Sequence, residues 1–290
     1  MNILLTGATG FIGQNFCDYL KNKKHSVLAI SRRKSILKKK NYKFINSSFR
    51  ISNRNLKIIN DFKPDVVVNL AWYGIPNFSN ENSKKNLSDQ KFFFEKIKNI
   101  SSIKKVFSFG SCWEYRKKSG ICLENNLVKT DTFFNKSKFK LKIYLENLCK
   151  KKSINFFWLR LFYVYGPYQR KKSLLPSLIY AIKNKKKNPV NSIENTNDFI
   201  YVGDVCKLIY KLLTSKTAKG GTYNIGSGKL TEVKRIVEIV YDFYNLKFDV
   251  KKIKYKKSIY ASIKKIKNID KLFLPSDLKK SIIKTIKYYD

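Results

Sequence analysis

The sequence predicts an α/β protein, a doubly wound parallel sheet with a smaller C-terminal lobe. A short apolar run, Ile3-Leu4-Leu5, leads directly into glycines at three-residue spacing, Gly7, Gly10 and Gly13. Apolar strand-like runs then alternate with segments of helical period as far as about residue 165, which is typical of a parallel sheet. A chain of 290 residues with 43% hydrophobic content can fill one large domain and an attached lobe.

The elements can be placed in order along the chain. After the glycines, Phe16, Cys17 and Leu20 continue with helical period, so a helix follows the first strand. Later buried runs predict further strands, and one segment predicts a helix between them. The expected strands are 26–30, 44–45, 65–71, 104–109 and 156–161, and the expected helix is 55–62. Gly166-Pro167 then breaks the alternation.

The strand, glycine turn and helix at residues 3–20 predict a dinucleotide site. Residues without a Cβ let the backbone approach a pyrophosphate, whose charge is favoured beside the unpaired N–H groups of a helix start. The alternative is a tight turn that holds no ligand. The strand before the glycines and the helix after them are the context that makes this motif specific.

The residues after the second expected strand indicate which dinucleotide is preferred. A cofactor with a free ribose 2′-hydroxyl normally meets an Asp or Glu there, but this chain continues Ser31-Arg32-Arg33. Two guanidinium groups suit a 2′-phosphate, so NADP is predicted over NAD. The alternative is that arginines fall here by chance in a chain with 61 Lys and Arg.

The formal net charge of +41 does not itself predict a nucleic-acid partner. The lysines are spread along the whole chain, which indicates a solvated basic surface, and specific binding needs a patch with reading residues. No apolar stretch approaches the ~18 residues that a membrane span needs, and we expect a cytoplasmic protein. Five cysteines without metal-type spacing, beside a single histidine, His25, predict reduced thiols and no metal site.

Several motifs in order resemble the extended short-chain dehydrogenases/reductases, a family of NAD(P)-dependent nucleotide-sugar epimerases, dehydratases and reductases. The motifs that carry this resemblance are residues 6–13 (TGATGFIG), 69–71 (NLA), 110–115 (GSCWEY), 159–167 (LRLFYVYGP) and 224–228 (NIGSG). Within the family, residues 70–72 with 110–115 and 161–163 most resemble the branch that reduces dTDP-4-keto-6-deoxyhexoses or similar activated sugars, for surface polysaccharide.

The resemblance implies a Rossmann domain over residues 1–165, to which 199–225 return, and a mainly substrate-binding lobe over 166–290. It also implies a nucleotide-sugar substrate and a homodimer formed through helices near 86–98 and 134–150.

The resemblance further implies the site residues. Catalytic positions fall at Ser111 and Lys138, with Phe134 where the family carries its catalytic tyrosine. Cofactor-binding positions fall at Gly7, Gly10, Phe11, Ile12, Gly13, Arg32, Arg33, Leu70, Ala71, Asn86 and Lys138. Substrate-binding positions fall at Ser111, Cys112, Tyr163, Leu175 and Asn197. Plain structural alternatives are a turn or cap serine for Ser111, a solvated helical lysine for Lys138 and an exposed helical asparagine for Asn86.

Phe134 puts the usual chemistry in question. A tyrosine four residues before a lysine lies on the same helical face, where the ammonium lowers the pKa of the phenol that donates the proton. A phenyl ring has no proton to give. An active enzyme would then use water, a substrate hydroxyl, Ser111, Tyr115 or Tyr163 as the source. We expect a nucleotide-sugar reductase or epimerase; the alternative is a protein that binds cofactor and sugar nucleotide without catalysis.

Overall fold

The computed structural model describes residues 1–33, 41–248 and 253–290, and the largest sheet in this part of the chain has seven strands. The strand order is β11-β7-β5-β4-β1-β2-β3, and the registers of β1 with β2 and β4, of β2 with β3 and of β4 with β5 are parallel. The strands are β1 (Asn2–Thr6), β2 (Ser26–Ser31), β3 (Tyr42–Asn46), β4 (Val66–Asn69), β5 (Lys105–Ser111), β7 (Asn155–Leu161) and β11 (Gly221–Ile225). The predicted α/β class is confirmed.

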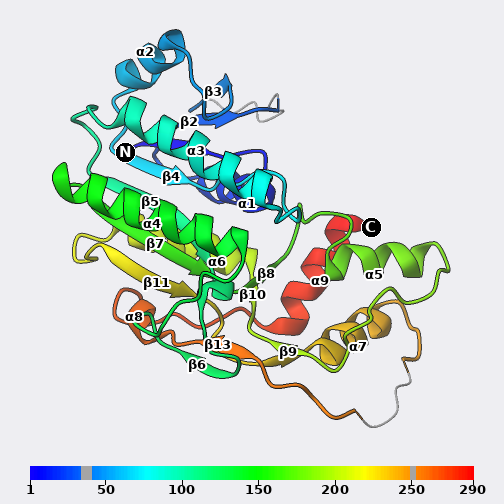
Figure 1. The fold of residues 1–290 in the computed structure, drawn as a ribbon. Helices are drawn as coiled ribbons and strands as arrows, with labels where there is room; N and C mark the ends of the chain where they lie inside the picture. The colour runs from blue at the N-terminus through cyan, green and yellow to red at the C-terminus, as the bar shows by residue number, and fades with distance from the viewer. Residues whose placement is uncertain (34–40, 249–252) are drawn as a thin grey trace. The chain divides into compact units, whose positions relative to one another are not determined.

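Helices α3 (Asn80–Ile97) and α4 (Phe133–Lys151) lie side by side along one face of this sheet (Figure 1). Their buried side chains join those of the strands in one core that includes Leu4, Val67, Phe93, Leu141 and Trp158. Burial of such side chains is the main source of stability for this layer, at about 25 cal/mol for each Å² of apolar surface removed from water.

Side-chain caps set where these helices start. Ser79 accepts a hydrogen bond from the backbone N–H of Asn82 at the start of α3, and Thr132 accepts one from Asn135 at the start of α4. Ser52 caps α2 (Asn53–Phe62) in the same way, which explains why that helix begins before the predicted Asn55. Ser and Thr are favoured at such positions because they satisfy backbone donors that the helix leaves unpaired.

The chain forms two compact units. Unit 1 contains residues 1–116, 127–160 and 213–223, and unit 2 contains residues 117–126, 161–212 and 224–290. Elements not yet named are α1 (Phe11–Leu20), η1 (Cys112–Glu114), β6 (Gly120–Cys122), β8 (Tyr163–Tyr165), α5 (Leu174–Lys183), β9 (Thr196–Asn197), β10 (Phe199–Tyr201), α6 (Val202–Thr214), β12 (Thr231–Glu232), α7 (Val233–Phe243), β13 (Ile259–Ala261), α8 (Lys264–Lys267) and α9 (Leu278–Tyr289).

Unit 2 has its own core, to which α5, α7 and α9 contribute Leu178, Val237 and Ile282. The fully buried carboxylate of Asp198 links three segments of unit 2 through hydrogen bonds. One oxygen accepts from the backbone N–H and the hydroxyl of Ser227, and the other from the backbone N–H groups of Gly228 and Ala261. Four hydrogen bonds compensate for the loss of water around this buried carboxyl group.

All five cysteines are buried as thiols, and no disulfide links them. No group of three metal-ligating side chains occurs among the residues that the structure describes. Over the same described ranges, no helix combines the length and the apolar character that crossing a bilayer requires.

Candidate functional site

The glycine turn between β1 and α1 is packed against the chain that leaves β4. Gly7 has φ +73°, and a Cβ built on it would lie 2.8 Å from the backbone N of Ala71. A Cβ on Gly13 would lie 2.1 Å from the carbonyl oxygen of Gly7. Both positions therefore exclude any larger residue, because backbone atoms cannot move aside.

The start of α1 fits the anionic part of a dinucleotide. Gly10 occupies the N-cap position, its lack of a side chain leaves the cap without a side-chain hydrogen bond, and the first turn carries no acidic residue. A helix start of this kind presents backbone N–H groups and the positive end of the helix dipole. Phe11, Ile12 and Gly13 form the first turn, so all five glycine-turn residues in the predicted cofactor set meet here.

A buried chain of polar side chains fixes the ends of the central strands beneath this turn. The Thr6 hydroxyl donates to Oδ1 of Asn69 at 2.7 Å and accepts from the backbone N–H of Ala71 at 3.3 Å. Nδ2 of Asn69 donates to Oε1 of Gln90 at 2.6 Å and to the hydroxyl of Ser108 at 3.1 Å. Ala71 and its neighbour Leu70 are thus held beside Gly7, where the sequence predicts cofactor contact.

The two arginines of the predicted 2′-phosphate site are exposed at the end of β2. The guanidinium of Arg32 lies 4.4 Å from the centroid of the Tyr73 ring, which orients it by a cation–π contact. Tyr73 donates a hydrogen bond to Asp89, which also accepts from Nε of Arg50 at 2.7 Å. Burial alone would raise the pKa of the Asp89 carboxyl, but these two hydrogen bonds bring it below its ordinary value.

Asn86 is fully buried rather than exposed, and its amide is occupied by the backbone of Tyr73. Its Nδ2 donates to the Tyr73 carbonyl at 2.9 Å, and its Oδ1 accepts from the Tyr73 N–H at 3.0 Å. It therefore holds the loop after β4 in place.

Ser111 ends β5 and caps the short helix η1 that follows. Its hydroxyl accepts from the Trp113 N–H at 3.2 Å, and its own N–H donates to Oε1 of Glu114 at 2.9 Å, which forms a reciprocal capping box. Cys112 lies between them and is buried.

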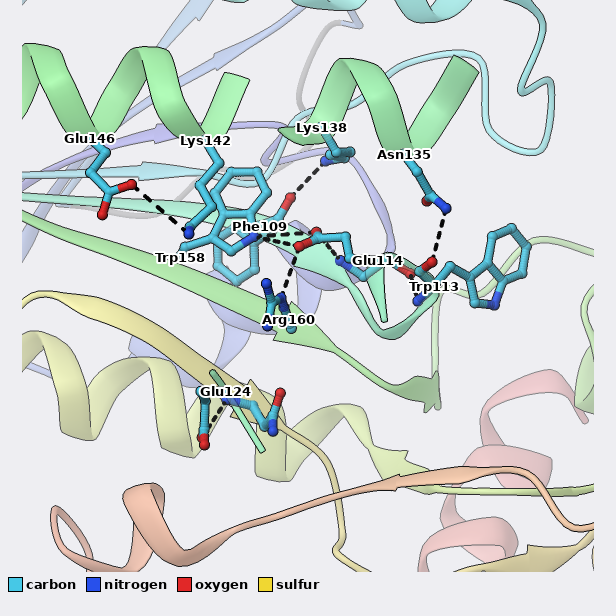
Figure 2. A network of polar contacts seen from close by, with 12 residues as sticks. Phe109, Trp113, Glu114, Glu124, Asn135, Lys138, Lys142, Glu146, Trp158 and Arg160 are labelled. Atoms are coloured by element: carbon cyan, nitrogen blue, oxygen red, sulfur yellow. Dashed lines mark hydrogen bonds and ion pairs between the residues drawn. The ribbon is translucent and has the colours of Figure 1, made fainter. Parts of the chain in front are cut away.

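Glu114 carries a negative charge on a side chain that is only 3% exposed (Figure 2). Its carboxylate accepts from the indole N–H of Trp158 at 3.0 Å and from Nε of Arg160 at 2.9 Å. Tyr115 adjoins this pair, because the Arg160 guanidinium lies 4.5 Å from its ring centroid. Sequence reasoning missed Glu114 and Arg160. The signals for them are the Ser-x-x-Glu spacing and a lone charge inside an apolar strand.

Phe134 and Lys138 lie one turn apart on α4, and both are buried. The Phe134 ring packs edge-on against three aromatic rings, with centroid distances of 4.9 Å to Phe78, 5.5 Å to Trp72 and 6.3 Å to Trp113. Such edge-to-face pairs are favourable beyond their buried area.

The Lys138 ammonium points to the carbonyl oxygen of Phe109, to which it donates at 2.7 Å (Figure 2). It also lies 3.9 Å from the centroid of the Trp72 ring. Burial lowers the pKa of Lys138 to about 7, although the charge of Glu114 raises it. Lys138 is thus not a solvated surface lysine.

Three predicted substrate residues belong to unit 2. Tyr163 on β8 and Leu175 on α5 line a cavity of about 240 Å³ together with Tyr165, Gln169, Phe199 and other side chains. Asn197 lies on β9, where it pairs with Thr231 of β12.

These features define an α/β protein whose first strand and helix are joined by a glycine turn of the dinucleotide-binding type, with a serine, a lysine and a phenylalanine at its candidate catalytic positions. The chain belongs to the NAD dependent epimerase/dehydratase family, whose model matches residues 3–226.

Individual relatives are distant. A dTDP-D-glucose 4,6-dehydratase of Dictyostelium discoideum is 26% identical over 82% of this chain, which spans 62% of that relative's length. A dTDP-6-deoxy-L-talose 4-dehydrogenase (NAD(+)) of Aggregatibacter actinomycetemcomitans is 25% identical over 87% of this chain and 93% of its own. The crystal structure of UDP-glucuronic acid 4-epimerase from Bacillus cereus in complex with NAD superposes with a TM-score of 0.85, covering 100% of this chain and 98% of that one at 23% identity.

Proposed function

We propose that this protein is an NADP-preferring oxidoreductase or epimerase of nucleotide sugars, acting on a dTDP-4-keto-6-deoxyhexose or a similar activated sugar for surface polysaccharide. The observation that carries the proposal is that Phe134 and Lys138 of α4 contact the two sides of the Ser111 segment: Lys138 donates to the Phe109 carbonyl, and the Phe134 ring packs on Trp113. The same chain has a glycine turn built for close backbone approach. The names of two relatives, both acting on dTDP-linked hexoses, support the substrate class.

The cofactor preference is supported by the residues that follow β2. Arg32 and Arg33 are exposed there, with no carboxylate among Ser31, Arg32 and Arg33, and Arg32 is oriented by Tyr73. A guanidinium binds a phosphate through charge-assisted hydrogen bonds, which are stronger than neutral ones. The residues proposed to hold the cofactor are those of the glycine turn, the two arginines, Leu70, Ala71 and Lys138, with Asn86 acting through the Tyr73 backbone that its amide binds. A nicotinamide held by these residues would supply a hydride to, or accept one from, the carbonyl or carbinol carbon of the sugar.

The substrate residues are proposed from both units. The Ser111 hydroxyl accepts one hydrogen bond as a cap and keeps its own proton, so it can donate to a carbonyl or hydroxyl oxygen of the sugar. In unit 2, the cavity lined by Tyr163 and Leu175 has mostly apolar and aromatic walls, which suit a planar base or the apolar face of a sugar ring. Cys112 and Asn197 complete the proposed set.

A protein that binds these ligands without catalysis is the second candidate. The buried position of Phe134 among Phe78, Trp72 and Trp113 favours it, because this ring fills the place of the usual proton donor with a well-packed apolar group.

The proposal includes a division of the chain into two domains. These are a Rossmann domain over 1–165, completed by 199–225, and a mainly substrate-binding lobe over 166–290. The proposal also includes a cytoplasmic location and a homodimer formed through the helices near 86–98 and 134–150.

The test is NADPH consumption with dTDP-4-keto-6-deoxyglucose, measured for the parent and for Phe134→Tyr. Oxidation by the parent supports the enzyme. Where the parent uses only water as the proton source, Phe134→Tyr should be faster by about 10²- to 10⁴-fold, which is the typical contribution of a positioned proton donor. A silent parent with an active Phe134→Tyr variant supports the binding protein. Silence in both contradicts the proposed substrate class.

A further inference from the structure

Phe134 is surrounded by the rings of Trp72, Phe78 and Trp113, and its own ring has no proton to give. We compare three side chains of unit 1 as proton donors: Ser111 and Tyr115, which the sequence offers, and Lys138, one turn along α4 from Phe134. The contacts of each side chain in the structure decide whether it can act as the proton donor.

Tyr115 and Ser111 are poorly suited to donate a proton to the substrate. The Tyr115 ring lies against the Arg160 guanidinium and is only 1% exposed, so its hydroxyl is inside the core of unit 1. The Ser111 hydroxyl can donate a hydrogen bond, but a serine hydroxyl is a far weaker acid than an ammonium and does not release its proton near neutral pH.

Lys138 is placed to hold a proton and to release it. Its ammonium has three N–H donors, of which the Phe109 carbonyl takes one at 2.7 Å. The face of Trp72 at 3.9 Å stabilises the cation, and the ring of Phe134 is 5.8 Å away. Burial favours the neutral amine, and the negative charge of Glu114 favours the cation. The ammonium is therefore an acid that works near pH 7.

We propose that Lys138 is itself the proton donor of this site, in the role of the phenol that Phe134 lacks. The inference rests on the proposed function. In the reducing direction the carbonyl carbon gains a hydride from reduced nicotinamide, the carbon–oxygen double bond becomes a single bond, and the oxygen gains a proton from Lys138. The neutral amine then takes up a proton from water. In the oxidising direction the neutral amine accepts the hydroxyl proton.

Substitution of Glu114 offers a way to change the pKa of Lys138 without changing Lys138 itself. The charge of Glu114 raises the pKa of the Lys138 ammonium, and its carboxylate accepts hydrogen bonds from Arg160, Trp158 and the Ser111 N–H. Glu114→Gln keeps the shape and removes the charge, so Lys138 should lose its proton at a lower pH in this variant. Trp72→Leu removes the ring that stabilises the cation and should act in the same direction.

The first measurement needs no substrate. Competitive acetylation of the full-length protein across pH 5–11, read peptide by peptide by mass spectrometry, gives the titration midpoint of Lys138, with the exposed Lys136 and Lys140 of the same helix as internal references. We expect a Lys138 midpoint within about one unit of 7 and a lower midpoint in Glu114→Gln. If Glu114→Gln fails to fold, Trp72→Leu provides the comparison. A Lys138 midpoint like that of Lys140 overturns the proposal.

The second measurement is the pH profile of NADPH oxidation with dTDP-4-keto-6-deoxyglucose. The protonated amine is the active form, so the rate should fall as pH rises through the Lys138 midpoint, and the fall should move to lower pH in Glu114→Gln. Lys138→Met should lose at least about 10²-fold in kcat, whereas Lys140→Met should keep the parent rate. In Phe134→Tyr, the introduced phenol should act as the proton donor, so the rate should fall at a higher pH than in the parent.

The outcomes separate this inference from the proposed function. An active parent whose profile stays flat through the Lys138 midpoint overturns the proton-donor role and leaves the reductase. A silent parent beside an active Phe134→Tyr variant also overturns it, because Lys138 would then not replace the phenol. Silence in both overturns the proposed function, and the role of Lys138 with it.

Discussion

The carboxylate of Glu114 accepts a 2.9 Å hydrogen bond from Nε of Arg160, and both side chains are 3% exposed. This ion pair links η1, which Ser111 caps, to the buried strand β7. A buried pair adds little net stability over a well-packed apolar pair, but removing one partner leaves an uncompensated charge in the core.

Glu114→Ala should therefore lower the free energy of unfolding by about 3–5 kcal/mol. Urea unfolding followed by circular dichroism measures this. Glu146→Ala is the matched control, because Glu146 lies on α4 with half of its side chain exposed and 3.9 Å from Lys142. That surface pair should contribute about 0–1 kcal/mol. Equal losses in the two variants would show that Glu114 does not act as a buried charge.

Gly7→Ala should abolish NADPH binding and cost at least about 1–3 kcal/mol of stability, because the new methyl group would lie 2.8 Å from the Ala71 backbone at a positive φ. Gly120→Ala tests the effect of φ alone. Gly120 has φ +86°, but the nearest atom to its Cβ would be at 3.4 Å in the flexible Lys117 side chain. Gly120→Ala should cost only about 1–2 kcal/mol and keep the parent affinity for NADPH. Parent-like NADPH affinity in Gly7→Ala would contradict the placement of the cofactor at this turn.

The burial of Lys138 should make stability depend on pH. Its folded-state pKa of about 7 lies below its unfolded value of about 10.4, so between these values the unfolded chain binds more protons than the folded one. The unfolding free energy of the parent should therefore rise relative to Lys138→Met as pH increases from about 7 to 10, by about 1.4 kcal/mol for each unit of pKa shift. A constant difference over that range would mean that Lys138 titrates normally.

Replacing both Arg32 and Arg33 with alanine should weaken NADPH binding by about 10- to 100-fold and leave NADH binding unchanged, because a hydrogen bond to a charged group contributes about 1.5–3 kcal/mol. Titration calorimetry with each cofactor measures the change. Arg54→Ala, an exposed arginine on α2, is the control for the loss of surface charge. Equal losses for NADPH and NADH would argue against a 2′-phosphate contact.

The fold was predictable because its signals are local. Each of four central strands is an apolar run that borders a turn or a helix cap, and these signals can be read from the sequence. The strands are β1, β2, β4 and β5. Strand order in the sheet depends on contacts between distant residues, which no local pattern carries.

The sequence predicted only those residues of the candidate site that belong to recognisable family motifs. Ser111, Phe134 and Lys138 were found through the family resemblance, yet the burial of Lys138 was not, because a chain with 61 Lys and Arg gives no reason to single out one lysine. The Glu114 to Arg160 pair joins positions 46 residues apart, and only the folded chain brings them together.

The central claim is that this protein transfers a hydride between a nicotinamide and a nucleotide sugar. Mass spectrometry of the sugar product formed with NADPH deuterated at its transferable position tests it most directly, with the parent protein at stoichiometric concentration so that a single turnover is visible. We predict that the product carries deuterium at the former carbonyl carbon. Bound NADPH and bound sugar nucleotide without deuterium in any product would contradict catalysis and identify a binding protein.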